Sequence, residues 1–213
     1  MPKKETDLAA RILNKTLELL QEKEPEEIST RDIAASCGVT ATSLYYYYKD
    51  KETLFSELKL HCLEEMDKAI LERMARKLKK NRTKSKERWV LELRAGLEAF
   101  RDWAFENPRI ALLVMGRFKA DTQAGLQKME KYYRTTLFAK QILDKAVQAG
   151  LSGSKDTLLD VSLCIAALWG AIEQVLLFRT VPSYWSKQGG LFFTDKMIDW
   201  VLLKLQSYRN GFY

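Results

Sequence analysis

The chain has 213 residues, of which 46% are hydrophobic, 30% charged and 11% aromatic, with only 10 Gly and 4 Pro. This composition excludes disordered, collagen-like and low-complexity proteins, and it supplies one sizeable core or a small module joined to a larger one. The formal net charge is +7, but residues 1–52 hold eight basic and ten acidic side chains, and the excess is densest in residues 73–88. Such a run is either a solvated helix end with its linker or a phosphate-binding arm, so total charge identifies no DNA-binding surface.

The compartment is predicted from the N-terminus, the most apolar window and the cysteines. Residues 1–24 alternate charged with apolar side chains and lack a signal-peptide pattern, so we expect a cytoplasmic protein. The most apolar window, 161–178, is interrupted by Glu173 and Gln174 and favours a buried helix over a membrane span. The three cysteines are widely spaced and form no CxxC pair, which argues against a disulfide framework and a zinc finger. We expect no cofactor, no metal and no membrane partner.

Hydrophobic periodicity predicts helices along the whole chain. The first is amphipathic, begins at Thr6 or Asp7 and ends before Pro25. After two short helices come further expected helices at about 50–78, 85–107, 108–114, 122–149, 156–180 and 194–205, with caps at Asp50, Ser85, Ser154 or Asp156, and Thr194. Residues 181–190 are expected to form a loop. No segment alternates with a two-residue period, so the predicted fold class is all-α, with about nine helices.

The two short helices lie within residues 28–54. Ser29 and Thr30 can cap the first, Gly38 can adopt the left-handed conformation of a sharp turn, and Thr40 can cap the second, which ends near Tyr47. Two short helices joined by a tight glycine turn form a helix-turn-helix.

The second short helix has an uncharged outer face. At 100° per residue, Leu44 and Tyr48 point inward, and the outward residues are Thr42, Ser43, Tyr45 and Tyr46. Hydroxyl groups can bind phosphate oxygens, and threonine methyl groups can contact thymine methyl groups in the major groove. Lys49 and Lys51 lie just beyond, where an ammonium group can neutralise backbone phosphate, and the next helix start offers backbone amides. The tyrosines could instead form a local core cluster, which we prefer for Tyr48 alone.

At these residues the sequence resembles the TetR family of prokaryotic transcriptional repressors. The matching residues are Thr30, Ile33, Ala34, Gly38, Val39, Ser43, Leu44, Tyr45, Tyr47, Lys51, Glu52 and Leu54. Departures are Thr42, where the family often has Gly or Pro, Tyr48 for Phe, and Asp50 for Ser or Asn. The resemblance is specific over residues 8–60 and extends to the whole chain through helix count and length. Because Thr42 lies on the base-reading face, no known operator sequence can be carried over.

The resemblance implies an N-terminal three-helix DNA-binding domain over residues 1–52 and a larger effector-binding and dimerisation domain over residues 53–213. It implies a repressor that binds a palindromic operator in double-stranded DNA as a homodimer and is released by a small-molecule effector. The residues expected to hold phosphates are Thr30, Thr40, Ser43, Tyr46, Tyr47 and Lys51. Those expected nearest base edges are Arg31, Ala41, Thr42 and Tyr45.

The C-terminal part is expected to supply a dimer interface and an effector cavity. Because residues 161–178 are apolar on nearly every side, this helix needs burial on two faces, and it can pair with the last helix in a four-helix interface. The expected interface residues are Leu168, Ile172, Leu176, Ile198, Leu202 and Leu205. The expected residues around an apolar or amphipathic effector are Trp103, Phe118, Tyr133, Trp169 and Glu173. Glu173 either binds the effector or pairs with an arginine across the helices.

The sequence leaves three alternatives to a DNA-binding repressor. An enzyme is disfavoured because His61 is the single histidine, Cys62 points about 100° away from it, and no Gly-rich phosphate loop, HExxH or EF-hand pattern is present. The second alternative keeps the DNA headpiece but responds to a protein partner, which ligand-induced thermal stabilisation would exclude. The third is a helical interaction protein without DNA affinity, which salt-dependent DNA binding would exclude.

Overall fold

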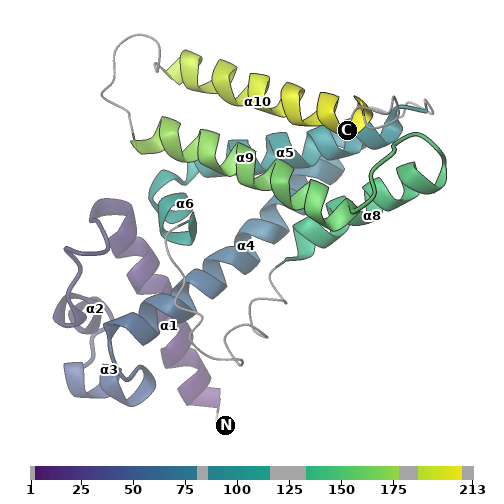
Figure 1. Cartoon of the computed structure of the whole chain (residues 1–213). Helices are drawn as coiled ribbons and strands as arrows, with labels where there is room; N and C mark the ends of the chain where they lie inside the picture. Colours follow the sequence, from purple (N-terminus) through teal and green to yellow (C-terminus); the bar gives the residue numbers. More distant parts are fainter. Residues whose placement is uncertain (1–2, 81–85, 116–132, 178–186, 208–213) are drawn as a thin grey trace. The chain divides into compact units, whose positions relative to one another are not determined.

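The computed structural model describes residues 3–80, 86–115, 133–177 and 187–207. Throughout these four ranges the regular elements are helices, so the all-α prediction is confirmed (Figure 1). In chain order the helices are α1 (Lys3–Glu22), α2 (Thr30–Ser36), α3 (Ala41–Tyr47), α4 (Lys51–Lys80), α5 (Arg88–Glu106), α6 (Pro108–Met115), α8 (Arg134–Gln148), α9 (Thr157–Leu177) and α10 (Lys187–Ser207).

The chain divides into two compact units. The N-terminal unit comprises Met1–Leu63 with Arg109–Asp121, and the C-terminal unit comprises Glu64–Pro108 with Thr122–Tyr213. Helix α4 therefore belongs to both units, and α6 groups with the N-terminal one. The domain boundary expected after residue 52 stays a prediction.

The N-terminal unit is built around one apolar core. Every helix from α1 to α4 contributes to it, and so does the connection between α1 and α2. Its fully buried side chains are Ile12, Leu20, Ile28, Ile33, Leu44, Leu54 and Leu58. Complete burial of each such side chain stabilises the fold by about 1.5–3 kcal/mol. These helices thereby hold α2 and α3 in a fixed arrangement.

Helix α6 is attached to the end of α1. The Arg109 guanidinium donates to the carbonyl oxygen of Gln21, and its Nε lies 3.3 Å from the Glu24 carboxylate. The contact places a positive charge beside the last carbonyl groups of α1, where the helix dipole favours a cation.

In the C-terminal unit, α9 packs against α5, α8 and α10. By length and composition α9 is the one described helix that could cross a membrane, a property that core helices of water-soluble proteins share. The core of the C-terminal unit contains fully buried leucine and isoleucine side chains from α8, α9 and α10: Leu143, Leu168, Ile172, Ile198 and Leu202.

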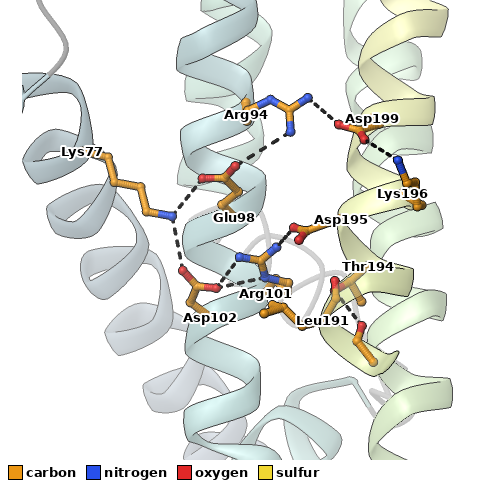
Figure 2. Close-up of polar contacts among 11 residues, drawn as sticks. Lys77, Arg94, Glu98, Arg101, Asp102, Leu191, Thr194, Asp195, Lys196 and Asp199 are labelled. Atoms are coloured by element: carbon orange, nitrogen blue, oxygen red, sulfur yellow. Dashed lines mark hydrogen bonds and ion pairs between the residues drawn. The ribbon is translucent and has the colours of Figure 1, made fainter. Parts of the chain in front are cut away.

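An ionic network joins α4, α5 and α10 in this unit (Figure 2). At its centre the Arg101 side chain is only 8% exposed and donates to the Asp102 carboxylate at 2.6 and 2.9 Å and to Asp195. Lys77 bridges Asp102 and Glu98 at 3.2 and 2.9 Å. Hydrogen bonds to two carboxylates satisfy a guanidinium group that would otherwise be costly to bury.

The start of α10 differs from the prediction. The helix begins at Lys187, so residues 187–190 are helical and Thr194 lies inside the helix, where its hydroxyl donates to the carbonyls of Gly190 and Leu191. A Cβ atom on Gly190 would lie 2.5 Å from Val175 Cγ1. The glycine therefore allows close approach of α9 and α10, whereas the sequence analysis assigned it to a loop.

The boundaries of α8 and α9 are partly as predicted. Helix α8 begins at Arg134, after a non-helical Tyr133, so the expected helix from residue 122 is not continuous. Its part before Tyr133 and the expected Ser85 cap lie outside the described residues. Gly150 ends α8 with φ +67°, as expected, and the Asp156 carboxylate caps α9 by accepting from the amide of Leu159 at 3.0 Å.

Candidate nucleic-acid interface

A capping box at its start and a glycine after its end define α2. The Ser29 hydroxyl accepts from the amide of Asp32 at 3.1 Å, while the Asp32 carboxylate accepts from the amide of Ser29 at 2.9 Å, which completes a capping box. The side-chain and backbone hydrogen bonds from Ser29 lower the pKa of Asp32. At the other end Gly38 adopts φ +65°, which reverses the chain within one residue. The caps and turn expected from the sequence are confirmed.

Helix α3 is anchored on its inner side. Thr40 caps it by accepting from the amide of Ser43 at 3.1 Å, and the two hydroxyl oxygens are 2.9 Å apart. Leu44 and Tyr48 are buried, as predicted. The Tyr48 hydroxyl lies 3.4 Å from the carbonyl oxygen of Ala9, and burial raises the pKa of Tyr48 to about 12.

The outer side of α3 is open to solvent. Thr42 is exposed, and the tyrosines Tyr45 and Tyr46 are 48% and 76% exposed. The hydroxyl oxygens of Tyr45 and Thr30 are 3.3 Å apart, so α2 and α3 bring two predicted DNA-binding residues together. The ring of Tyr46 packs edge-on against Tyr47, with centroids 5.3 Å apart.

Lys51 and Asp50 have structural roles at the start of α4. The Lys51 ammonium group donates to the carbonyl oxygen of Pro25 at 2.7 Å and lies 5.3 Å from the centroid of Phe55. The Asp50 carboxylate accepts from both the amide and the hydroxyl of Thr53 at 2.7 Å, and these hydrogen bonds lower the pKa of Asp50. The Thr53 amide at the start of α4, which we expected to be available to a phosphate, therefore already donates to Asp50.

The ten residues predicted to contact DNA lie on α2, on α3, in the turn between them and at the start of α4. The exposed ones are Arg31, Thr40, Thr42, Tyr45 and Tyr46, and the half-buried ones are Thr30, Ala41, Ser43, Tyr47 and Lys51. Since none is buried, each is sterically available, and their contacts with DNA remain predictions.

The residues predicted to surround an effector differ in exposure, and their place in one site stays a prediction. Trp103 is buried, and the Trp169 ring lies 5.7 Å from Phe100. Tyr133 is 48% exposed at the start of α8. Phe118 lies outside the described residues. Glu173 is exposed on α9, and its predicted contact with an effector or with an arginine stays a prediction.

A buried carboxylate on α4, that of Asp67, was not predicted from the sequence. Its side chain is 2% exposed, and Oδ1 accepts from the Thr135 hydroxyl at 2.7 Å, with further hydrogen bonds from the amides of Arg134 and Thr135. No described group hydrogen-bonds to Oδ2. Burial raises the pKa of Asp67. The available signal was an acidic residue directly beside the apolar positions Met66 and Ile70 of α4.

The six residues predicted for the dimer interface are all buried within the single chain: Leu168, Ile172, Leu176, Ile198, Leu202 and Leu205. Their contact with a partner stays a prediction. The large apolar side chains that are exposed on the same two helices are Leu158, Leu159, Leu163, Leu177, Leu191, Phe192, Trp200 and Leu203. Periodicity did not distinguish the two faces because α9 is apolar on nearly every side.

Residues 12–58 match the family model for bacterial regulatory proteins of the tetR family. No curated protein sequence matches the chain at a significant level. Among solved structures, the chain is similar to a TetR-family transcription regulator from Shewanella sp. PV-4, with 18% identity, TM-score 0.64 and coverage of 93% of this chain and 97% of that one. It is also similar to the TetR-family regulator PfmR from Thermus thermophilus, with 19% identity, TM-score 0.60 and coverage of 91% and 97%.

A bacterial regulatory protein of the tetR family from Rhodococcus RHA1 is 20% identical, with TM-score 0.62 and coverage of 96% of this chain and 98% of that one. At these identities the solved structures show a common fold over nearly the whole chain, and the family-model match covers the helix-turn-helix. The capped α2, the glycine turn and the outward-facing α3 all lie within residues 12–58, the part of the chain that matches the tetR family model, and the solved TetR-family structures share the fold.

Proposed function

We propose that this regulator is a repressor that places α3 in the major groove of double-stranded DNA. The observation that carries the proposal is the two-sided character of α3, with Leu44 and Tyr48 buried and Thr42, Tyr45 and Tyr46 exposed. A helix of this width fits the major groove, where side chains reach base edges.

The phosphate contacts come from the residues around α3. Thr30, Thr40, Ser43, Tyr46 and Tyr47 carry hydroxyl groups that can donate to phosphate oxygens. The Lys51 ammonium group uses one N–H for its hydrogen bond to the Pro25 carbonyl oxygen. Its two other N–H groups can donate to a phosphate at the same time. These contacts predict an affinity that falls steeply with salt concentration.

The repressor acts as a homodimer through the exposed apolar faces of α9 and α10. Leu159, Leu163, Ala166 and Gly170 recur along α9 at helical spacing, and Gly170 has no neighbouring atom within 4 Å of its would-be Cβ. Small residues flanked by leucines allow two helices to approach closely and bury apolar surface. Two-fold symmetry of the dimer predicts a palindromic operator.

Dimerisation is tested by the double substitution Leu163→Arg and Leu203→Arg, followed by sedimentation equilibrium. We expect a folded monomer, because both side chains are exposed in the single chain. Leu137→Arg is the matched control, since this leucine is exposed on α8, and it should leave the dimer intact. A dimer that survives the double substitution contradicts this interface.

A small-molecule effector releases the repressor from DNA. A polar group of the effector donates a hydrogen bond to the Asp67 carboxylate. The support is the Oδ2 atom of this buried carboxylate, which no described group hydrogen-bonds. An unsatisfied buried oxygen is costly, so a ligand donor that reaches it gains affinity. We expect an apolar or amphipathic molecule with a hydrogen-bond donor, and we expect cytoplasmic localisation and no enzymatic activity.

The decisive experiment is selection of duplexes from a randomised DNA pool with the purified protein at moderate salt. We expect an enriched palindrome that the double variant Tyr45→Ala/Tyr46→Ala fails to select. Tyr133→Ala is the matched control, because this tyrosine is as exposed as Tyr45 but lies in the C-terminal unit. No enrichment by a folded dimer would overturn the repressor proposal and favour a protein-interaction role.

A further inference from the structure

The recognition face of α3 lacks every side chain that makes paired hydrogen bonds to a base. Arginine and lysine read guanine in this way, asparagine and glutamine read adenine, and aspartate and glutamate accept from cytosine. The seven residues of α3 are ATSLYYY, and none belongs to these types. Residues 22–80 contain no asparagine or glutamine at all. Arg31 is the single basic side chain in residues 28–48, and it lies on α2.

Some of the hydroxyl groups near α3 are already engaged within the protein. The Thr40 hydroxyl caps the helix and pairs with the Ser43 hydroxyl at 2.9 Å. The Tyr45 hydroxyl is 3.3 Å from that of Thr30. Hydrogen-bonded readout by this face therefore depends mainly on Thr42 and on Tyr46, which are both exposed.

The groups that the face does present are methyl groups and aromatic rings. At 100° per residue, Thr42 and Tyr46 lie one turn apart on the side opposite Leu44 and Tyr48. Thr42 carries a methyl group, and the tyrosine rings of α3 provide apolar edges beside it. In the major groove, the base feature that matches such groups is the C5-methyl of thymine.

We propose that α3 reads its operator half-site through thymine methyl groups, with the Thr42 methyl group as the central contact and the Tyr46 ring beside it. This inference rests on the proposed repressor function and names the DNA chemistry that the same surface recognises. The half-site beneath α3 is then rich in thymine, and any guanine contact comes from Arg31 rather than from α3.

The test uses the duplex enriched by selection from the randomised pool. Each thymine of a half-site is replaced by deoxyuridine, which removes the methyl group and keeps the base pair. We expect one or two positions at which the dissociation constant rises about fourfold per half-site, as the loss of one buried methyl group predicts. Changing both half-sites should multiply the two effects.

Two variants of Thr42 separate the methyl group from the hydroxyl group. Thr42→Ser keeps the hydroxyl and should bind the thymine duplex about as weakly as the wild type binds the deoxyuridine duplex, with no further loss on the latter. Thr42→Val keeps a methyl group and should still discriminate the two duplexes. Because Thr42 is exposed, neither change should alter the thermal midpoint by more than a few degrees.

Readout by methyl groups is overturned if deoxyuridine leaves affinity unchanged at every thymine while the protein still binds its selected duplex in a salt-dependent way. That outcome leaves the repressor proposal intact. If no duplex is enriched, the repressor proposal fails and methyl readout fails with it.

Discussion

The helix-turn-helix and the C-terminal helices differ in how much their sequences reveal about their faces. In α3 and its C-cap, the buried residues Leu44 and Tyr48 alternate with exposed residues at the helical repeat, so the outward side follows from spacing alone. In α9, leucines occur on the buried side and on the exposed side, as Leu168 and Leu163 show. A helix that is apolar all round has no sequence signal for which face meets its own core.

The largest expected effect on stability comes from comparing a buried and an exposed leucine of α9. Leu168→Ala should lower the free energy of unfolding by about 2–5 kcal/mol, because the side chain is fully buried and leaves a cavity. Denaturant unfolding measures this loss, which should not depend on protein concentration. Leu163→Ala should instead show a concentration-dependent loss, since this leucine is exposed in the single chain and lies at the proposed dimer interface.

The ionic network provides a second comparison. Asp195→Ala removes one of two carboxylates from the buried Arg101 and should cost about 1.5–3 kcal/mol in thermal or chemical unfolding. Asp199→Ala is the control, because its side chain is equally exposed at 46% but its partner Arg94 is much less buried than Arg101. We expect about 0.5 kcal/mol for the control, and equal losses would show that burial of Arg101 is unimportant.

Each unit contains one glycine with a left-handed backbone conformation, so the effect of the same substitution can be compared between the two units. Gly38→Ala and Gly150→Ala each force a left-handed residue, at φ +65° and +67°, with no atom near the added Cβ. Each should therefore cost about 1–2 kcal/mol of stability from backbone conformation alone. Only Gly38→Ala should also weaken DNA binding in a filter or fluorescence assay, because Gly38 sets the turn between α2 and α3. Equal DNA affinity for the two variants would contradict that role.

Asp67 predicts a pH dependence that originates in the C-terminal unit. Burial raises its folded-state pKa above the ordinary value of 3.8, so its carboxyl group favours the folded state below pH 3.8. That contribution is lost as the pH rises through the folded-state pKa. Stability of the wild type relative to Asp67→Asn should thus fall with increasing pH in this range and then become constant. Parallel stability curves for the two proteins would contradict the raised pKa.

The smallest effect is expected for Tyr48→Phe, which restores the side chain usual in the family. The hydroxyl group makes one long hydrogen bond of 3.4 Å to Ala9 and the ring stays buried, so stability should change by less than about 1 kcal/mol. DNA affinity should be unchanged, because this side chain faces the core. Reduced affinity with normal stability would place Tyr48 at the DNA.

Local signals account for what was predicted correctly. The capping residues Ser29 and Thr40 and the turn at Gly38 act through neighbours within a few residues, and each is found as predicted. The predictions are wrong where the role of a residue depends on a contact with a distant part of the chain. Gly190 allows α9 to approach α10, and this close contact, rather than a loop, explains the glycine.

The sequence by itself determined the all-helical class, the helix-turn-helix and the outward face of α3, because caps, turns and helical periodicity act over a few residues. Tertiary structure alone decided which side of α9 and α10 is buried. It also decided that Arg101 is held between two carboxylates and that Asp67 is enclosed beside α8. These outcomes depend on contacts between residues far apart in the chain, and packing selects among faces that the sequence leaves equally apolar.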